Sequence, residues 1–148
     1  MNLTWELKKF ETLTIEELYS ILQLRSEVFV VEQNCVYLDI DLKDKKALHL
    51  MGKTNNQLVA YARLFRPNDY FENASIGRVV IQPKYRSKKW GYELMEKATK
   101  GILEHFGETK ITISAQLYLQ SFYEKNGFIK TSDTYMEDDI PHIQMKKE

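Results

Sequence analysis

Apolar residues alternate with polar ones, or recur every three or four positions, along most of the chain, and these two periods predict strands and helices. Alternating or continuous apolar runs predict strands at residues 4–10, 47–53, 58–65, 75–82, 110–115, 128–131 and 140–145. Apolar positions spaced by three and four predict helices at residues 14–31, 91–106 and 116–126. Gly127 is expected in the left-handed conformation that ends the third helix. Residues 135–139 are expected to form an acidic turn.

The first predicted helix has a clear start and an unusual apolar face. Thr14 is followed three residues later by Glu17, which is the pattern of a capping box. Arg25 interrupts the apolar face, either as a buried ion-pair partner or as the mark of a pocket edge. Residues 32–46 then show no helical or alternating period, so we expect a long loop with at most one helical turn. Loops of this length are often functional, although a solvated acidic surface loop fits equally well.

The order of the predicted elements is β-α-β-β-β-α-β-α-β-β, with no repeat and no linker-like change in composition. This order predicts one α/β domain over residues 1–148 with a mixed sheet. The chain has 148 residues, of which 43% are hydrophobic and 28% charged, and this composition is globular rather than disordered.

Charge and cysteine content narrow the function classes. The formal net charge is zero, whereas a general nucleic-acid-binding protein usually carries a basic excess. The single cysteine, Cys35, excludes an internal disulfide framework and fits a reducing compartment. No apolar run approaches the ~20 residues of a membrane span, and the first ten residues lack a signal-peptide core. We therefore expect a cytoplasmic protein with no membrane or nucleic-acid partner. His49, His105 and His142 have no metal-like spacing with Cys35, so no metal is expected.

The stretch at residues 75–100 is the strongest candidate for chemistry. An apolar run ends at Pro83, a short loop carries Lys84, Arg86, Lys88 and Lys89, and a helical pattern begins near Gly91. A strand, a basic turn and a helix start together aim backbone N–H groups and positive charge at a phosphate. The competing interpretation is a solvated turn between a strand and a helix.

Two motifs in this order resemble the GCN5-related N-acetyltransferase (GNAT) family. The run VVIQPKYRSKKWGYEL is similar to the family's central motif, in which Pro83, Arg86 and Gly91 stand at the expected separations. Lys89 occupies a position where the family more often has a glycine. The later run AQLYLQSFYEKNGF is similar to a second family motif. Further similarity from residue 5 to residue 146 is typical of the ElaA-like branch, whose substrate is not defined.

The resemblance implies a sheet that is mostly antiparallel, splayed at the central strand and covered by helices on both faces. It also implies that acetyl-CoA lies in the opening as a cosubstrate and that Tyr123 protonates the departing thiolate. A backbone N–H near Val80 or Ile81 would stabilise the oxyanion. The implied coenzyme-binding residues are Val79, Val80, Ile81, Arg86, Ser87, Lys88, Lys89, Trp90, Gly91, Tyr92 and Gln116.

The acceptor is then an amine, on a small molecule or a peptide, and it must lose a proton before it attacks. Candidate bases are Glu32, Glu137 and His142. The acidic residues of the loop and the turn are expected to attract a cationic acceptor; they are Glu32, Asp39, Asp41, Glu137, Asp138 and Asp139. The alternative function is a module that binds coenzyme A without turnover. A homodimer is possible, because dimers are common in the family.

Overall fold

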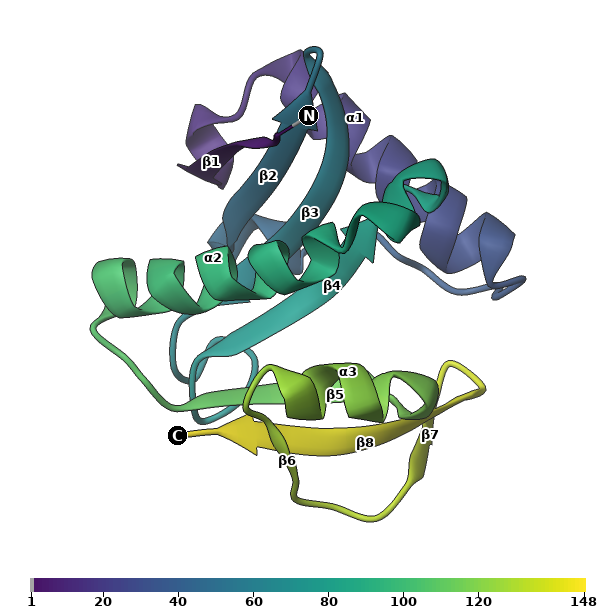
Figure 1. Ribbon diagram of the computed structural model, residues 1–148, viewed down its shortest axis with the longest axis vertical. Coiled ribbons are helices and arrows are strands. Elements are labelled where there is room, and N and C mark those ends of the chain that lie inside the picture. The colour runs from purple at the N-terminus through teal and green to yellow at the C-terminus, as the bar shows by residue number, and fades with distance from the viewer. Residues whose placement is uncertain (1) are drawn as a thin grey trace.

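The computed structural model describes residues 2–148, which form two antiparallel sheets side by side with helices packed on them (Figure 1). The first sheet has the strand order β1-β2-β3-β4, and the second has β5-β8-β6 with β7 paired to β8. The strands are β1 (Thr4–Lys9), β2 (Leu48–Thr54), β3 (Gln57–Phe65), β4 (Ser75–Ile81), β5 (Ile111–Gln116), β6 (Ile129–Lys130), β7 (Tyr135–Glu137) and β8 (Ile140–Lys147).

Three α-helices cover these sheets: α1 (Ile15–Arg25), α2 (Trp90–Phe106) and α3 (Gln120–Lys125). The two longer helices lie on opposite faces of the first sheet because its strands alternate in side-chain direction. Ala60, Ala62 and Leu64 of β3 belong to the core beneath α2. Tyr61 of β3 and Met51 of β2 belong to a second cluster, beneath α1. The expectation of helices on both faces is therefore confirmed.

One backbone contact joins the two sheets. Ala74, just before β4, forms a parallel bridge with Ile111 of β5, and the Thr112 N–H donates to the Ala74 carbonyl at 2.8 Å. Beyond this bridge β4 and β5 diverge, as Figure 1 shows. The predicted mixed sheet, mostly antiparallel and splayed at the central strand, is confirmed.

Several element boundaries differ from the predictions. The capping box at Thr14 is confirmed, but the α-helix stops at Arg25 and continues as a π-helical segment, η2 (Ser26–Glu32). Residues 116–126 were expected to form one helix. Instead Gln116 ends β5, and a 3₁₀ turn, η5 (Leu117–Leu119), leads into α3.

The acidic turn is shorter than expected. Tyr135–Glu137 forms β7, and only Asp138 and Asp139 make the turn, both with positive φ. Gly127 has φ +91°, which confirms the predicted left-handed stop after α3. The 32–46 loop contains the expected single helical turn, η3 (Lys43–Lys46).

Candidate functional site

The divergence of β4 and β5 produces a cavity of about 580 Å³. We call it the main cavity. Its walls come from β4, β5, η2, α3 and the β7–β8 hairpin, all within the described residues. This volume lies in the range of small-molecule and cofactor sites. The opening between the sheets is therefore large enough to bind a ligand and is not a packing defect.

One edge of β4 faces this cavity without a strand partner beyond Ala74, as far as residues 2–148 describe it. The Gln82 N–H donates to the Val59 carbonyl of β3 at 2.8 Å. Because backbone polar groups point to alternate sides along a strand, the N–H and carbonyl of Ile81 point away from β3, toward the cavity. The Ile81 carbonyl indeed accepts a hydrogen bond from Arg86 Nε at 3.2 Å. The same alternation points the Val80 N–H toward β3. Of the two backbone N–H groups expected to stabilise the oxyanion, that of Ile81 is therefore the better placed.

A β-bulge interrupts the pairing of β3 and β4 at the middle of this edge. The register shifts between Tyr61 and Arg63, and Arg78 has φ +50°. A non-glycine residue in this region is strained and needs support from its surroundings. Asp39 supplies it, because its carboxylate accepts from Arg78 Nε at 2.7 Å and its carbonyl from Arg78 Nη2 at 3.2 Å.

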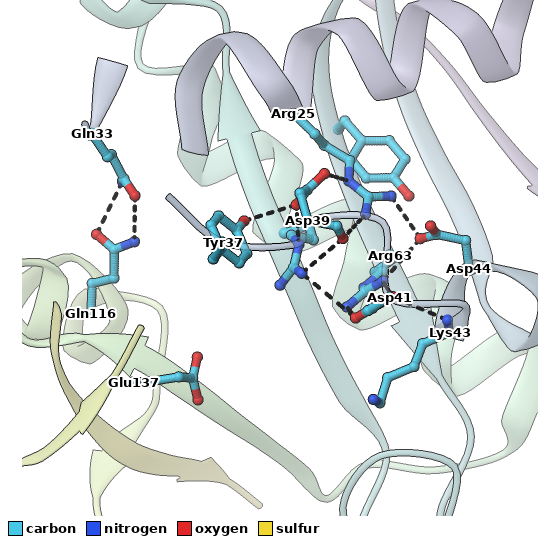
Figure 2. Close-up of polar contacts among 12 residues, drawn as sticks. Arg25, Gln33, Tyr37, Asp39, Asp41, Lys43, Asp44, Arg63, Gln116 and Glu137 are labelled. Carbon is cyan, nitrogen blue, oxygen red and sulfur yellow. Dashed lines mark hydrogen bonds and ion pairs between the residues drawn. The ribbon is translucent and has the colours of Figure 1, made fainter. Parts of the chain in front are cut away.

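The arginine and aspartate side chains around this bulge form one network, drawn in Figure 2. Arg25 is fully buried and bonds to Asp39 at 3.0 Å and Asp44 at 2.6 Å. Arg63 bonds to Asp41 at 2.7 Å and to Asp44 at 2.9 Å. Arg25 is therefore a buried ion-pair partner, which was the first of the two interpretations drawn from the sequence.

The network corrects the expected acidic surface. Asp39, Asp41 and Asp44 each bond to arginines and do not present free negative charge to an acceptor. Although burial opposes its ionisation, hydrogen bonds and charge from Arg63 hold the pKa of Asp41 below its usual range. Of the expected acidic residues, Glu137, Asp138 and Asp139 have no arginine partner among residues 2–148.

The basic turn forms a 3₁₀ segment, η4 (Pro83–Lys88), directly before α2. Lys89 joins the two in the left-handed conformation, with φ +60° and ψ +24°. The chain thus adopts at Lys89 the conformation that glycine adopts at least cost. At Gly91 a Cβ would lie 3.3 Å from the ring of Phe122, so this glycine lets α2 approach α3 closely.

The remaining residues of the turn differ in exposure. Ser87, Lys88 and Lys89 are exposed, and Trp90 is buried against Tyr85. Tyr92 and Lys89 line the main cavity. Their predicted contacts with a coenzyme stay predictions, while the burial of Trp90 gives it a packing role.

Arg86 and Glu32 were predicted as coenzyme ligand and candidate base, and the structure pairs them with each other. Arg86 Nη1 and Nη2 donate to the Glu32 carboxylate at 2.6 and 2.8 Å. The hydrogen bond from Arg86 is the main cause that lowers the pKa of Glu32. A carboxylate held in this way is a weak proton acceptor at neutral pH. Its position on Arg86 is one that a phosphate oxygen can take.

Tyr123 is buried in α3 and lines the main cavity. It packs edge-on against Phe122 and Phe128, with ring centroids 5.1 and 6.0 Å away. Burial, with a smaller contribution from Tyr118, raises the pKa of Tyr123 above its usual value. The hydroxyl therefore carries its proton at neutral pH, as a general acid must.

His142 and Glu137 lie together on the opposite wall, which β5, β7 and β8 form. His142 Nδ1 lies 2.7 Å from the Ile140 carbonyl, which can only accept, so Nδ1 carries a hydrogen. Nε2 then faces Glu137 Oε2 at 3.4 Å. The other oxygen of Glu137 accepts from Ser114 Oγ at 3.1 Å, and Ser114 Oγ lies 2.5 Å from the Tyr135 hydroxyl. Figure 2 shows the Glu137 side chain extending from this wall toward β4.

Gln116, a predicted coenzyme ligand, has a partner across the opening. Its side-chain amide exchanges two hydrogen bonds of 3.2 Å with the amide of Gln33, which follows η2 (Figure 2). Both residues line the main cavity. The pair links the two walls, so a ligand that enters between them must pass beside or break this contact.

Sequence reasoning missed the roles of Arg78, Gln33 and Ser114. Arg78 was inside a predicted strand, and only its positive φ shows that it supports a bulge. Tyr37, from the segment after η2, also lines the main cavity. No group of three metal-binding side chains occurs among residues 2–148, and none of their helices is long and apolar enough to cross a membrane.

Comparison with known proteins agrees with this geometry. Residues 12–148 match the family described as acetyltransferase (GNAT) domain. The chain belongs to the GNAT acetyltransferase family. The GNAT chain is 42% identical over 146 residues to protein ElaA of Escherichia coli, covering 97% of this chain and 95% of ElaA. It is 43% identical over 149 residues to a UPF0039 protein of Schizosaccharomyces pombe, covering 99% and 98% of the two chains.

Solved structures support the same family. The crystal structure of an acyl-CoA N-acyltransferase from Pseudomonas aeruginosa superposes on this GNAT chain with a TM-score of 0.93, at 42% identity and over 99% of both chains. The expected family and its ElaA-like branch are therefore confirmed. The fold is that of acyl-CoA N-acyltransferases.

Proposed function

We propose that this protein is an N-acetyltransferase that moves the acetyl group of acetyl-CoA to an amine. The observation that carries the proposal is the unpaired edge of β4, which lies along the main cavity between a protonated tyrosine and a histidine–glutamate pair. An extended ligand arm can add to such an edge as an extra strand. The fold supports the same activity, because solved relatives with it are N-acyltransferases.

On the coenzyme side, the chain offers backbone groups and positive charge. Val79 stands two residues before Ile81 on the same edge of β4, so its backbone groups can pair with the amide groups of the pantetheine arm. Arg86 exchanges its Glu32 partner for a phosphate oxygen of the coenzyme. The backbone N–H groups around the start of α2, from Ser87 to Gly91, then face the pyrophosphate.

On the acceptor side, an ammonium group must lose a proton before its nitrogen can attack. Glu137 attracts the ammonium, and His142 Nε2 or Glu137 accepts the proton. The Ser114 hydroxyl holds the carboxylate in place through its 3.1 Å hydrogen bond. We assign this proton transfer to the His142–Glu137 pair and not to Glu32, because the Glu32 carboxylate lies beside Arg86 on the coenzyme side of the cavity.

The reaction then needs one bond formed and one broken. The amine nitrogen bonds to the thioester carbonyl carbon, and the Ile81 N–H stabilises the developing oxyanion. The carbon–sulfur bond breaks, and the thiolate takes a proton from the Tyr123 hydroxyl. The nitrogen, once bonded to the acetyl carbon, loses its second proton, and the Tyr123 phenolate takes up a proton in its place through solvent. The base of the first step releases its proton to solvent, so all groups return to their starting state.

The test combines product detection with coenzyme binding. The protein is incubated with acetyl-CoA and a panel of amines, and mass spectrometry detects products heavier by one acetyl group. We expect at least one amine to be acetylated in proportion to enzyme. If coenzyme A binds in calorimetry and no amine of a broad panel is acetylated, the protein is instead a coenzyme-binding module.

A further inference from the structure

A small side pocket of about 50 Å³ lies against the main cavity. We call it the branch pocket. Its other walls include Arg63 and Tyr70, and it shares five residues with the main cavity: Ile76, Gly77, Arg78, Ser114 and Glu137. Gly77 and Ser75 place it toward the beginning of β4, on the opposite side of the bulge from the basic turn. An acceptor bound beside Glu137 therefore lies next to it.

The branch pocket contains a buried donor without a partner. Arg63 is 1% exposed, and its two terminal nitrogens bond to Asp41 and Asp44 at 2.7 to 2.9 Å. Its third donor, Nε, has no hydrogen-bond partner among residues 2–148. Buried polar groups are almost always hydrogen-bonded in native proteins. An unpartnered donor on a pocket wall therefore points to an acceptor atom from outside the chain.

Gly77 is what leaves space beside this donor. It stands directly opposite Arg63 in the pairing of β3 and β4. A Cβ built on Gly77 would lie 4.0 Å from Arg63 Nε and would meet no other atom within that distance. A side chain at this position would thus fit, and it would occupy the space in front of the donor. Packing therefore does not require a glycine at position 77, and the glycine instead keeps the pocket empty.

We propose that the branch pocket takes a neutral oxygen of the acceptor, a carbonyl or a hydroxyl, which accepts a hydrogen bond from Arg63 Nε. The charges around the pocket decide against a carboxylate. The two cations of the pocket wall are already paired, Arg63 with Asp41 and Asp44 and Arg78 with Asp39 and Asp41. Glu137 adds a further negative group to the wall. An alkyl group would leave the donor unsatisfied. The volume suits one small group, since a water molecule fills about 30 Å³ in the liquid.

This inference rests on the proposed function and defines its substrate class. The acceptor is an amine with a neutral oxygen a short distance from the nitrogen, as in amino amides, peptide N-termini and amino alcohols. Glu137 belongs to both cavities, so it can face the ammonium while the oxygen occupies the branch pocket.

Four small amines test the class directly. Glycinamide offers a carbonyl, ethanolamine a hydroxyl, glycine a carboxylate and propylamine no oxygen. We expect kcat/KM for glycinamide or ethanolamine to exceed the value for propylamine by at least about tenfold, the effect of one hydrogen bond to a charged group. Glycine should be poorer than glycinamide. Turnover without any such preference would overturn the proposal and leave the acetyltransferase function standing.

Two substitutions at Gly77 fill the branch pocket in different ways. Gly77→Ser adds a hydroxyl that can accept from Arg63 Nε, and Gly77→Ala adds a methyl group that cannot. In both variants the ratio of kcat/KM for glycinamide to kcat/KM for propylamine should fall to about one. Tyr37→Phe is the matched control, because Tyr37 lines the main cavity and not the branch pocket. It should keep the preference, whatever its effect on the absolute rates.

The Arg63 Nε–H signal in an NMR spectrum separates the two proposals, because it does not depend on turnover. With coenzyme A present, glycinamide should shift this signal in the wild-type protein, and propylamine should not. A shift by glycinamide in a protein that acetylates no amine would disprove the acetyltransferase function and support the branch pocket. A signal that responds to neither amine would overturn the branch pocket, even if amines are acetylated.

Discussion

Lys89 shows at the scale of one residue how the chain keeps a phosphate-binding turn without a glycine. Its left-handed backbone, with φ +60°, connects η4 to α2. This conformation costs a residue with a Cβ roughly 1 kcal/mol or more. Its side chain is exposed, so nothing in the core opposes a change at this position.

Lys89→Gly should raise the free energy of unfolding by about 0.5–1 kcal/mol, because glycine adopts the native φ without strain. Affinity for coenzyme A should change little, since the backbone N–H groups stay in place. Urea denaturation and calorimetry measure the two quantities. Lys88→Gly is the control, and it should destabilise the protein because φ of Lys88 is not positive. A loss of stability in Lys89→Gly would show that the left-handed backbone of Lys89 is not strained.

Tyr123→Phe removes the proposed acid and keeps the packing of the ring against Phe122 and Phe128. We expect kcat to fall about 10²-fold, the lower end of the effect of general acids, with coenzyme affinity retained. Steady-state thiol release and calorimetry check both values. Tyr19→Phe, on the exposed face of α1, is the control and should have wild-type kinetics. An unchanged kcat in Tyr123→Phe would remove this residue from the mechanism.

The start of α1 illustrates the scale of an element, because Glu17 both caps the helix and pairs with two lysines. Its carboxylate accepts from the Thr14 N–H at 2.9 Å and from Lys8 and Lys53 at 3.0 Å each. Although partial burial pushes its pKa upward, these contacts lower it from 4.5 to about 2. A folded-state pKa below the unfolded value means that the stabilisation is complete above pH 4.5 and is lost as the pH falls toward 2.

Glu17→Gln should therefore lower the free energy of unfolding by about 1 kcal/mol at pH 7, a value reduced by the exposure of the lysines. Glutamine preserves the capping-box hydrogen bond, so the substitution removes the charge alone. The difference between variant and wild type should shrink as the pH falls from 4.5 to 2, as denaturation at several pH values can show. A difference that does not depend on pH would exclude the ion pairs as its cause.

The segment between η2 and η3 shows why its structure could not be predicted from its sequence. Val36, Leu38, Ile40 and Leu42 are exposed, while the side chains between them turn inward. The expectation that this segment has no alternating period was therefore wrong for residues 36–42. These residues do alternate, but with the polar side chains inside, because the arginines of α1, β3 and β4 lie there. Arg25 within an apolar helix face was the one signal of this in the sequence.

Asp39→Asn should lower the free energy of unfolding by about 3 kcal/mol, the lower end of the range for a broken buried ion pair, because Arg25 keeps Asp44 and Arg78 keeps Asp41 as a partner. Urea denaturation measures the loss. Asp133→Asn, at an exposed position, should change stability by less than ~0.5 kcal/mol. A similar small effect for Asp39→Asn would show that the network contributes little.

At the scale of the whole molecule, the fold could be predicted from the sequence, but the side chains that bond to each other inside the site could not. The order of strands and helices and the opening at the central strand follow from periodicity and two motifs. Motifs also led to Tyr123 and to the turn before α2. They could not show that Glu32 binds Arg86 or that Gln33 bonds Gln116, because these pairs are far apart in sequence and meet only across the opening. The expected homodimer stays a prediction.

The central claim is that the cavity between β4 and β5 moves an acetyl group to an amine, and thiol release tests it most directly. Initial rates are measured at saturating acetyl-CoA, with and without a mixture of amines that includes amino amides. We predict a rate that rises at least about tenfold with added amine and saturates as the amine concentration increases. The same rate of thiol release with and without amines would contradict the claim.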